Sequence, residues 1–250
     1  MSKLQETQIL QFLQENQYAN VNEISTALSV SGATIRRKLS ILQDKGLIVR
    51  THGGAQINDT NNFYPSFSFR SHQNCLEKKK IALQAIKFIK NGDLVFIDGS
   101  TSCFFIADYL TQFSDIKVVT NGIDTLSLLS KNKIKAYSTG GEISEANRSV
   151  LVGQIAQNTV KNMHADVAFF SAQSILENGE IYDCFEQENY LRQEMIKNAT
   201  KKVFLCDTTK LGKSSPFRLC NIDDVDYIVC EKQINNYFTK DVSKKIISLE

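Results

Sequence analysis

From residue 74 onward, the sequence alternates between short, uniformly apolar segments and longer segments in which apolar residues recur at helical spacing. The segments 94–97, 167–170 and 203–206 are examples of the short runs. Strands that are apolar on both sides do not fit a sheet with one face in water, because alternate residues of such a sheet point to solvent. We therefore predict an α/β domain whose mostly parallel sheet is sandwiched between helices, with ligand sites beyond the carboxyl ends of its strands.

The first 57 residues have a different pattern, which predicts a helix-turn-helix over about residues 20–39. Asn20 and Glu23 have the spacing of a capping box at the start of one helix. After a short turn, Ser31 can cap a second helix, whose inward stripe begins at Ile35. Small and basic residues occupy the outward arc near the start of this helix, as in a recognition helix that enters a major groove of DNA. The candidate DNA contacts from this helix are Ser31, Ala33, Thr34, Arg36 and Arg37.

Residues 47–57 predict a β-hairpin that follows the second helix as a wing. Glycines at its turn let the backbone approach a phosphate, and the side chains of Arg50 and His52 can reach the DNA backbone or minor groove. We therefore expect Arg50, His52 and Gly53 to contact DNA; a small packed hairpin without a ligand is the alternative. Together with the two helices, the hairpin gives a winged helix-turn-helix domain over residues 1–57.

The formal net charge of +2 is too small to make the whole surface attractive to nucleic acid, but the charge is unevenly distributed. Residues 1–57 contain six basic and four acidic residues, which accounts for the whole excess. From Arg36 to Arg50, five basic residues accompany one acid, Asp44. Such a patch suits the phosphate backbone of double-stranded operator DNA, although a solvated helix face gives the same pattern.

Residues 58–73 are polar, lack a long periodicity and are expected to link two domains, the second of which spans residues 74–250. Phe63, Phe67 and Phe69 are unusual in a free linker, so we expect part of it to pack on a neighbouring domain or subunit. An aromatic platform for stacking bases is the alternative.

Polar loops follow four of the predicted strands in the second domain. The loop 98–102 offers backbone N–H groups and hydroxyls at the start of a helix, where an anion is stabilised. An amide side chain, a pair of glycines and a lysine follow three other strands, and each of these alone also fits an ordinary turn or cap. Together they suit a small polyhydroxylated anion, and we predict a phosphorylated sugar. The candidate ligand-binding residues are Asp98, Gly99, Ser100, Thr101, Asn121, Gly140, Gly141 and Lys210.

An apolar run of about 18 residues, which a helix needs to cross a bilayer, is absent, and the first residues lack the apolar core of a secretory signal. We therefore expect a cytoplasmic protein without membrane contact. The six cysteines include no C-x-x-C pair and only three histidines accompany them, so neither a metal site nor any other cofactor is predicted. Reduced cysteines in apolar segments act as small hydrophobic residues, and we expect no redox role for them.

Residues 31–39 and 45–55 closely resemble the amino-terminal signature of the DeoR family of bacterial transcriptional regulators. Members of that family usually have Asp where this chain has Lys38. The difference changes the basic patch by two charge units and is not expected to disturb the fold.

The second domain resembles the family's carboxy-terminal sensor domain, which is related in fold to ribose-phosphate isomerases and coenzyme A transferases, over residues 75–231. The resemblance implies a repressor, or less often an activator, of carbohydrate-metabolism genes whose DNA affinity responds to a phosphorylated sugar. The loop 170–173 carries bulkier residues than the family's glycines, so the identity of the effector cannot be carried over. The matching motifs are 97–101, 120–121, Gly140 and Gly141 with Gly153, 165–166, and Asp207 with Lys210 and Gly212.

Assembly into a homodimer or homotetramer would place two recognition helices in the two half-sites of an operator. Two other functions fit the same fold. A sugar-phosphate isomerase needs a carboxylate beside the carbonyl, but residues 171–173 contain no acid. We interpret Asp183, Glu186 and Glu188 as the solvated start of a helix, where negative charge is favourable, and predict no catalytic residue. A purely structural dimerisation domain is the third alternative, and it would leave the strand-end loops unused.

Overall fold

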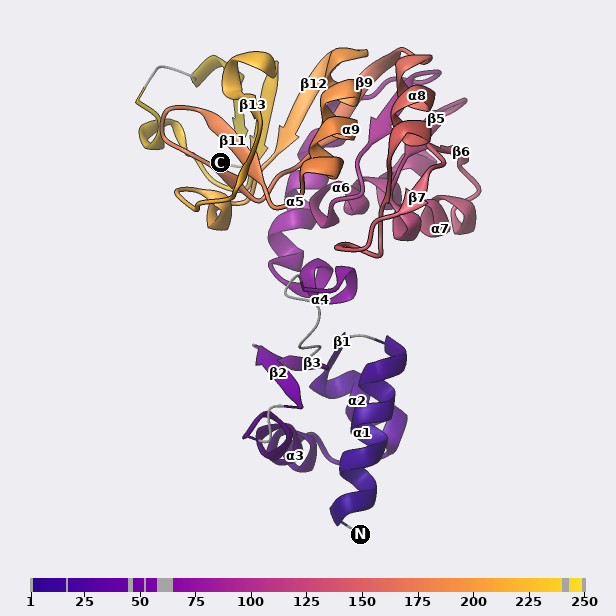
Figure 1. The fold of residues 1–250 in the computed structure, drawn as a ribbon, viewed down its shortest axis with the longest axis vertical. Coiled ribbons are helices and arrows are strands. Elements are labelled where there is room, and N and C mark those ends of the chain that lie inside the picture. Colours follow the sequence, from indigo (N-terminus) through magenta and orange to yellow (C-terminus); the bar gives the residue numbers. More distant parts are fainter. Residues whose placement is uncertain are drawn as a thin grey trace. The chain divides into compact units, whose positions relative to one another are not determined.

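The computed structural model describes residues 2–16, 18–44, 47–51, 53–57, 65–239 and 243–248, and Figure 1 shows their fold. The chain divides into two units, Met1–Gln73 and Asn74–Glu250. Each unit has its own apolar core. No helix of the described residues is long and apolar enough to cross a membrane.

The first unit combines three helices with a small antiparallel sheet of strand order β1-β3-β2 and a further short helix. Ile9 and Leu13 of the first helix pack with Ile24 and Ile35 in a core from which water is excluded. The helix-turn-helix and its wing are therefore present, and this part of the predicted fold is confirmed. The elements are α1 (Ser2–Asn16), β1 (Tyr18–Asn20), α2 (Val21–Leu28), α3 (Gly32–Asp44), β2 (Ile48–Thr51), β3 (Gly54–Ile57) and α4 (Phe67–His72).

The start and end of α2 are fixed by its neighbouring residues. The Asn20 side chain accepts hydrogen bonds from the backbone N–H groups of Asn22 and Glu23, each at 2.9 Å. The Glu23 carboxylate accepts one in return from the Asn20 N–H at 2.7 Å, which confirms the predicted capping box. Ser29 then takes a left-handed conformation with φ 52°, which ends the helix and turns the chain toward α3.

The last residues of the segment expected to be a linker form α4, which groups with the first unit. The ring of Phe69 packs edge-on against Tyr18 of β1 at a centroid distance of 5.6 Å, and the His72 ring lies 4.7 Å from the same tyrosine. Burial of Phe67 and Phe69 gives this turn of helix its packing surface. Phe63 lies outside the described residues.

The second unit is built on a seven-stranded parallel sheet of order β15-β14-β12-β9-β4-β5-β6. The prediction of a mostly parallel sheet is confirmed. Because neighbouring strands of this sheet are parallel, the chain must cross over the faces of the sheet between them. The strands are β4 (Leu94–Ile97), β5 (Lys117–Thr120), β6 (Lys135–Ser138), β9 (Ala165–Phe170), β12 (Ala199–Leu205), β14 (Tyr227–Cys230) and β15 (Ile246–Ser248).

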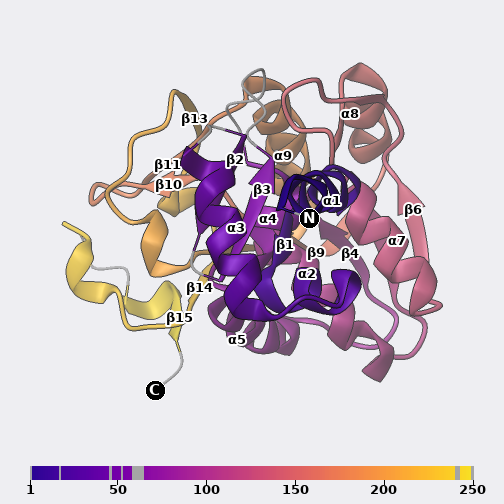
Figure 2. The ribbon, with the colours of Figure 1, turned by 90° about the horizontal axis from the view of Figure 1, so that it is seen from below.

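Both faces of this sheet are covered. Val95 and Ile97 of β4 pack in one apolar cluster with Ile81 of α5, whereas Phe96 between them packs with Leu191 of α9 in another. Figure 2 shows α5 on one side of the strands and α8 and α9 on the other. The helices are α5 (Cys75–Ala85), α6 (Thr101–Phe104), α7 (Ile123–Lys131), α8 (Gln154–Lys161) and α9 (Glu186–Lys197), with 3-10 helices at Ile86–Phe88, Phe105–Gln112, Thr208–Lys210, Ile222–Asp224, Asn235–Tyr237 and Ser243–Lys245.

Two smaller antiparallel sheets lie beside the main one. One contains β10 (Ser174–Ile175), β11 (Glu180–Asp183) and β13 (Phe217–Asn221), and the other is the pair β7 (Glu142–Ile143) and β8 (Leu151–Val152).

Strand β15, which the sequence pattern did not predict, extends the main sheet at one edge. The Nζ of Lys245 fixes the approach to this strand by donating to the backbone carbonyls of Ile222 at 3.0 Å and Val225 at 2.8 Å.

All six cysteines are free thiols. Burial raises the pKa of the Cys220 and Cys230 thiols to about 12 and that of Cys206 well above its usual value. Because the thiolate is the reactive form, burial keeps these side chains unreactive.

Candidate functional site

Helix α3 presents basic side chains to solvent at its start. Ile35 and Leu39 are buried in the core of the first unit, which turns Ala33, Arg36 and Arg37 outward, all three exposed. At the beginning of this helix, the Thr34 N–H donates to the Ser31 Oγ at 3.4 Å, and their side-chain oxygens lie 3.0 Å apart.

Lys38 does not belong to this outward surface, and its assignment to the basic patch was wrong. Its side chain is only 3% exposed, and its Nζ lies 3.0 Å from Oε1 of Glu6 on α1. The reason is geometric: three residues after Ile35, position 38 returns to the inward side of the helix. The basic patch between Arg36 and Arg50 therefore has one positive charge fewer on the surface than the count from the sequence.

The wing brings a further basic residue beside α3. The Nη1 of Arg50 donates to the Ser40 Oγ at 2.6 Å, so this guanidinium lies against the outward arc of the helix. Gly53 is exposed in the turn between β2 and β3 with φ 93°, a conformation that favours glycine. His52 and Lys45 lie outside the described residues.

In the second unit, β12, β9, β4, β5 and β6 are consecutive parallel neighbours, so the loops that follow them lie along one edge of the sheet. Lys210, after β12, reaches across to the next two strands. Its Nζ contacts the Ser171 Oγ after β9 at 2.5 Å and the Ser102 Oγ after β4 at 3.4 Å. Three strand ends thus meet around one ammonium group.

The carboxylate of Asp207 supports this lysine loop. It accepts hydrogen bonds from the backbone N–H and the hydroxyl of Thr209. Burial opposes its ionisation, but Lys210, Thr209 and Lys78 of α5 together lower the pKa of the Asp207 carboxyl below its usual value. Lys78 is itself buried, so two cationic side chains and one carboxylate lie near the end of β12.

Asp98 is fully buried and does not face the loop edge as a free ligand group. Its Oδ1 accepts from the Ser100 N–H at 3.0 Å. Its Oδ2 accepts from the Ser171 N–H at 3.1 Å and from the Nε of Arg192 at 2.8 Å. Both oxygens therefore hold neighbouring loops in place.

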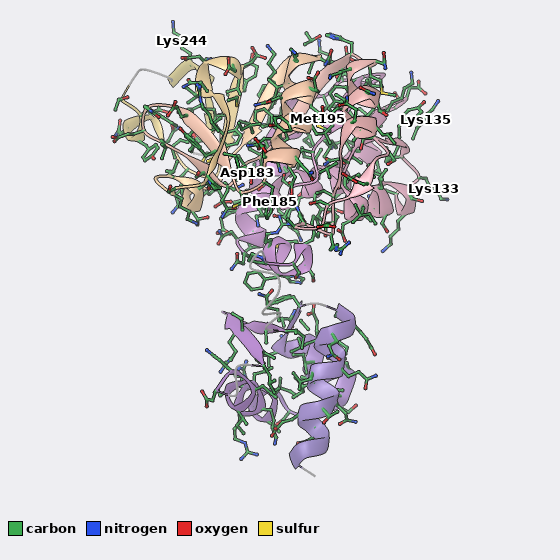
Figure 3. All side chains as sticks on the ribbon, viewed as in Figure 1. Lys133, Lys135, Asp183, Phe185, Met195 and Lys244 are labelled. Carbon is green, nitrogen blue, oxygen red and sulfur yellow. The ribbon has the colours of Figure 1, made fainter. Side chains whose placement is uncertain are left out.

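Arg192 of α9 forms ion pairs with two further carboxylates. Its Nη1 lies 2.9 Å from Oδ2 of Asp183, and its Nη2 lies 2.8 Å from Oε2 of Glu188. Burial disfavours a charged guanidinium, but these carboxylates and Asp98 raise the pKa of Arg192 well above its usual value. The Glu188 carboxylate also accepts from Asn147 Nδ2 at 3.0 Å. We call Arg192, Asp98, Asp183 and Glu188 the arginine cluster; Asp183 is labelled in Figure 3.

The arginine cluster corrects the interpretation of the acids that follow β11. Asp183 and Glu188 are each only 3% exposed, rather than solvated at a helix start. Glu186 is exposed, and it accepts a hydrogen bond from the Tyr190 hydroxyl at 2.7 Å.

The remaining candidates of the loop after β4 directly precede Ser102, which contacts Lys210. The Ser100 Oγ accepts from the Cys103 N–H at 3.2 Å and so caps α6, and Thr101 is 6% exposed. A side chain at Gly99 would collide with Val150, so the backbone here must pass close to a neighbouring segment.

The glycine pair after β6 is explained by local packing. Gly141 has φ 102°, and a Cβ there would overlap the Val152 carbonyl across the β7–β8 pair. Gly140 also has a positive φ, 65°. Asn121, after β5, donates from Nδ2 to the Leu151 carbonyl at 3.0 Å. Among the described contacts, those of Lys210 join the loops after β12, β9 and β4, whereas Asn121 and the glycines belong to the neighbouring β5 and β6 ends.

Four residues of this edge were missed by sequence reasoning. Ser102 and Ser171 lie in loops that were recognised, but nothing local distinguishes a hydroxyl that contacts a distant lysine. Lys78 lies in the helix that precedes β4, where a lysine is ordinarily exposed. For Arg192 the only local signal is its spacing of four residues from Glu188, because Asp98 is 94 residues away in the sequence.

Comparison with known proteins gives matches to two family models. Residues 6–61 match the model described as the DeoR-like helix-turn-helix domain, and residues 73–232 match the model described as the DeoR C terminal sensor domain.

Curated relatives align over nearly the whole chain. The HTH-type transcriptional regulator GolR of Listeria innocua is 31% identical over 94% of this chain and 92% of its own length. The HTH-type transcriptional repressor GlcR of Bacillus subtilis is 31% identical over 92% of this chain and 88% of its own length. The L-fucose operon activator of Haemophilus influenzae is 29% identical over 93% of this chain and 93% of its own length. A solved structure, ribose 5-phosphate isomerase A from Methanocaldococcus jannaschii, is 16% identical over 55% of each chain with a TM-score of 0.42.

Proposed function

The chain belongs to the DeoR family of transcriptional regulators, and we propose that a phosphorylated sugar bound in its second unit controls the affinity of its first unit for operator DNA. The observation that carries the effector proposal is the contact of Lys210 with hydroxyls from two other strand ends. An ammonium group among hydroxyls and helix-starting N–H groups suits a phosphate ester. Ser100, Thr101 and Lys210 hold the phosphate.

Repression of carbohydrate-metabolism genes is the proposed outcome of DNA binding. Two relatives support the connection: one is named a repressor, and another is named for an L-fucose operon, although as its activator. A ligand changes DNA affinity only if it binds the DNA-bound and DNA-free conformations differently. A coupling of about 1–3 kcal/mol between the two sites is sufficient. The proposed assembly is a cytoplasmic homodimer or homotetramer, which presents paired recognition helices to two half-sites.

In the proposed DNA complex, α3 enters the major groove. Ser31, Ala33, Thr34, Arg36 and Arg37 face the bases and flanking phosphates, and the wing residues Arg50, His52 and Gly53 contact the backbone or minor groove. The exposure of Arg36 and Arg37, and the position of Arg50 beside Ser40, support this surface.

Arg37→Ala is expected to weaken operator binding by about 1–3 kcal/mol, because a base or phosphate contact from a guanidinium is lost. Fluorescence anisotropy with labelled operator DNA measures the change. Arg218→Ala is the matched control, since Arg218 is an exposed arginine of the second unit. Equal affinities of wild type and Arg37→Ala would remove this residue from the DNA surface.

The second unit is proposed to sense its ligand without catalysis. Aldose–ketose isomerisation needs a carboxylate free to move a proton beside the carbonyl. Asp98, Asp183 and Glu188 instead each accept a hydrogen bond from Arg192. This commitment to one buried guanidinium supports a structural role for all three, and the curated relatives are named as regulators. Incubation of the purified protein with aldose and ketose phosphates tests for interconversion, and turnover would contradict the proposal.

Lys210→Ala is expected to weaken effector binding about 10- to 100-fold, because a hydrogen bond to a charged group contributes about 1.5–3 kcal/mol. Thermal shift against a panel of sugar phosphates detects the effector, since a ligand that prefers the folded state raises its melting temperature. Lys213→Ala, three residues further along the same loop and exposed, is the control. Ser100→Ala is expected to reduce the shift as well. An undiminished shift in Lys210→Ala would contradict the role of this lysine.

A further inference from the structure

Two buried polar atoms at the end of β5 have no hydrogen-bond partner among the described residues: Oδ1 of Asn121 and Oγ1 of Thr125. Asn121 is 4% exposed and Thr125 is fully buried, in the first turns of α7. Buried polar atoms are nearly always paired, and leaving one unpaired is unfavourable. Two such atoms, four residues apart, therefore point to a partner that is not one of the described residues.

Both atoms lie beside the loop proposed to hold the phosphate. A Cβ on Gly122 would lie 2.9 Å from Thr125 Oγ1 and 3.0 Å from the Cα of Gly99. The two glycines thus bring the end of β5 close to the end of β4. Gly99 directly precedes Ser100, so a ligand whose phosphate occupies that loop extends naturally toward Asn121 and Thr125.

The hydrogen-bonding capacity of the two atoms limits which chemical groups can be their partner. Asn121 Nδ2 is committed to the Leu151 carbonyl, which leaves Oδ1 as an acceptor, while the Thr125 hydroxyl can donate or accept. A phosphate dianion or a carboxylate has no proton to donate to Oδ1. A hydroxyl group satisfies both.

We propose that Asn121 and Thr125 form the subsite that recognises the hydroxyl groups of the effector's polyol chain. The proposal rests on the proposed function and deepens it, because it assigns the neutral end of the ligand to the β5–α7 junction. Thr125, which belongs to none of the motifs shared with the family, is then a residue that determines sugar specificity.

Segment 149–151 is hydrogen-bonded to the chain around the subsite. The Ile123 N–H donates to the Ser149 carbonyl and the Leu151 N–H to the Asn121 carbonyl, each at 2.9 Å, while Val150 packs over Gly99. Entry of a ligand requires this segment to move aside. Hydrogen exchange at the Ile123 and Leu151 amides is therefore expected to change when the effector binds.

Thr125→Val tests the subsite through two effects of opposite sign. Valine matches threonine in shape and removes an unpaired buried hydroxyl, so the ligand-free variant is expected to melt at a higher temperature than wild type. The same variant is expected to bind the sugar phosphate about 10-fold more weakly, because one hydrogen bond to the ligand is lost. Affinity for inorganic phosphate, which cannot reach the subsite, is expected to stay unchanged.

The probes are inorganic phosphate, ribose 5-phosphate, 2-deoxyribose 5-phosphate, glucose 6-phosphate and fructose 6-phosphate, titrated by calorimetry into the full-length protein. Ser248→Ala is the matched control: its Oγ, in β15 at the far edge of the sheet, is also buried and has no partner among the described residues. It is expected to raise the melting temperature without changing sugar affinity. Thr125→Ser, which keeps the hydroxyl, is expected to bind the sugar phosphate as wild type does.

Three results would overturn the subsite. A lower melting temperature of ligand-free Thr125→Val would mean that a trapped water already satisfies the hydroxyl. Equal sugar-phosphate affinities of Thr125→Val and wild type would refute the subsite and leave the proposed function intact. Binding of inorganic phosphate but of no sugar phosphate by the wild type would refute both.

Discussion

Arg192→Met is expected to lower the free energy of unfolding of the second unit by at least about 3–5 kcal/mol, because removing one partner of a buried ion pair leaves an uncompensated charge. Here three carboxylates lose the same guanidinium, and their side chains are at most 5% exposed. Domains are stable by only about 5–15 kcal/mol, so a large part of the total is removed. Urea denaturation followed by circular dichroism measures the loss.

The effect of this substitution on function follows from what Asp98 holds. Its carboxylate fixes the backbone of Ser171, which contacts Lys210, and that of Ser100, in the loop whose Ser102 contacts Lys210. We therefore expect Arg192→Met to lose effector binding even where the variant remains folded. Arg192→Lys is expected to restore little of the effector binding, because an ammonium group cannot reproduce the planar guanidinium that donates to three carboxylates.

Arg218→Met is the matched control for Arg192→Met. Arg218 also pairs with a carboxylate, Glu180, but at 3.5 Å and with a side chain 56% exposed, so its loss is expected to change stability little. Equal stabilities of Arg192→Met and Arg218→Met would show that the arginine cluster does not stabilise the unit.

Lys38→Met is expected to destabilise the first unit by about 3–5 kcal/mol and to abolish operator binding, since it removes the buried cation that lies 3.0 Å from the Glu6 carboxylate. The core of this unit is small, and small domains have little stability to lose. Thermal unfolding by circular dichroism and anisotropy with operator DNA measure the two losses together.

A second substitution separates folding from DNA contact. In Lys38→Met with Glu6→Leu, apolar side chains replace both charges, and replacing a whole buried pair is often neutral or stabilising. This double variant is expected to recover both the melting temperature and most of the operator affinity, and so is the charge exchange Lys38→Glu with Glu6→Lys. A double variant that folds but does not bind DNA would place Lys38 in the DNA surface after all.

The sequence predicted the elements that depend on short-range patterns. The capping box of Asn20 and Glu23 spans four residues, and its hydrogen bonds form as expected. The pattern of uniformly apolar strands separated by helices was sufficient to predict the parallel sheet, because such strands fit only a sheet that is buried on both faces. Strand β15 was missed because its three residues follow a basic segment, and they pair with β14 only in the folded sheet.

Residues of the candidate site were predicted where they stand at strand ends, since parallel strands bring their carboxyl ends to one edge. Gly99, Ser100, Thr101, Asn121 and Lys210 were chosen as candidates in this way. Their contacts were not predicted: Lys210 meets Ser171 and Ser102 from strands that are neighbours only in the folded sheet.

The sequence by itself determined that this chain has a helix-turn-helix with a wing and a parallel sheet with polar loops at its edge, because periodicity and capping act over a few residues. Only the tertiary structure decided that Lys38 turns inward to Glu6 and that Arg192 holds Asp98, Asp183 and Glu188. The physical reason is distance along the chain. Partners such as Lys38 and Glu6 are 32 residues apart. A local sequence pattern does not predict which two buried charges will form a pair over such a distance.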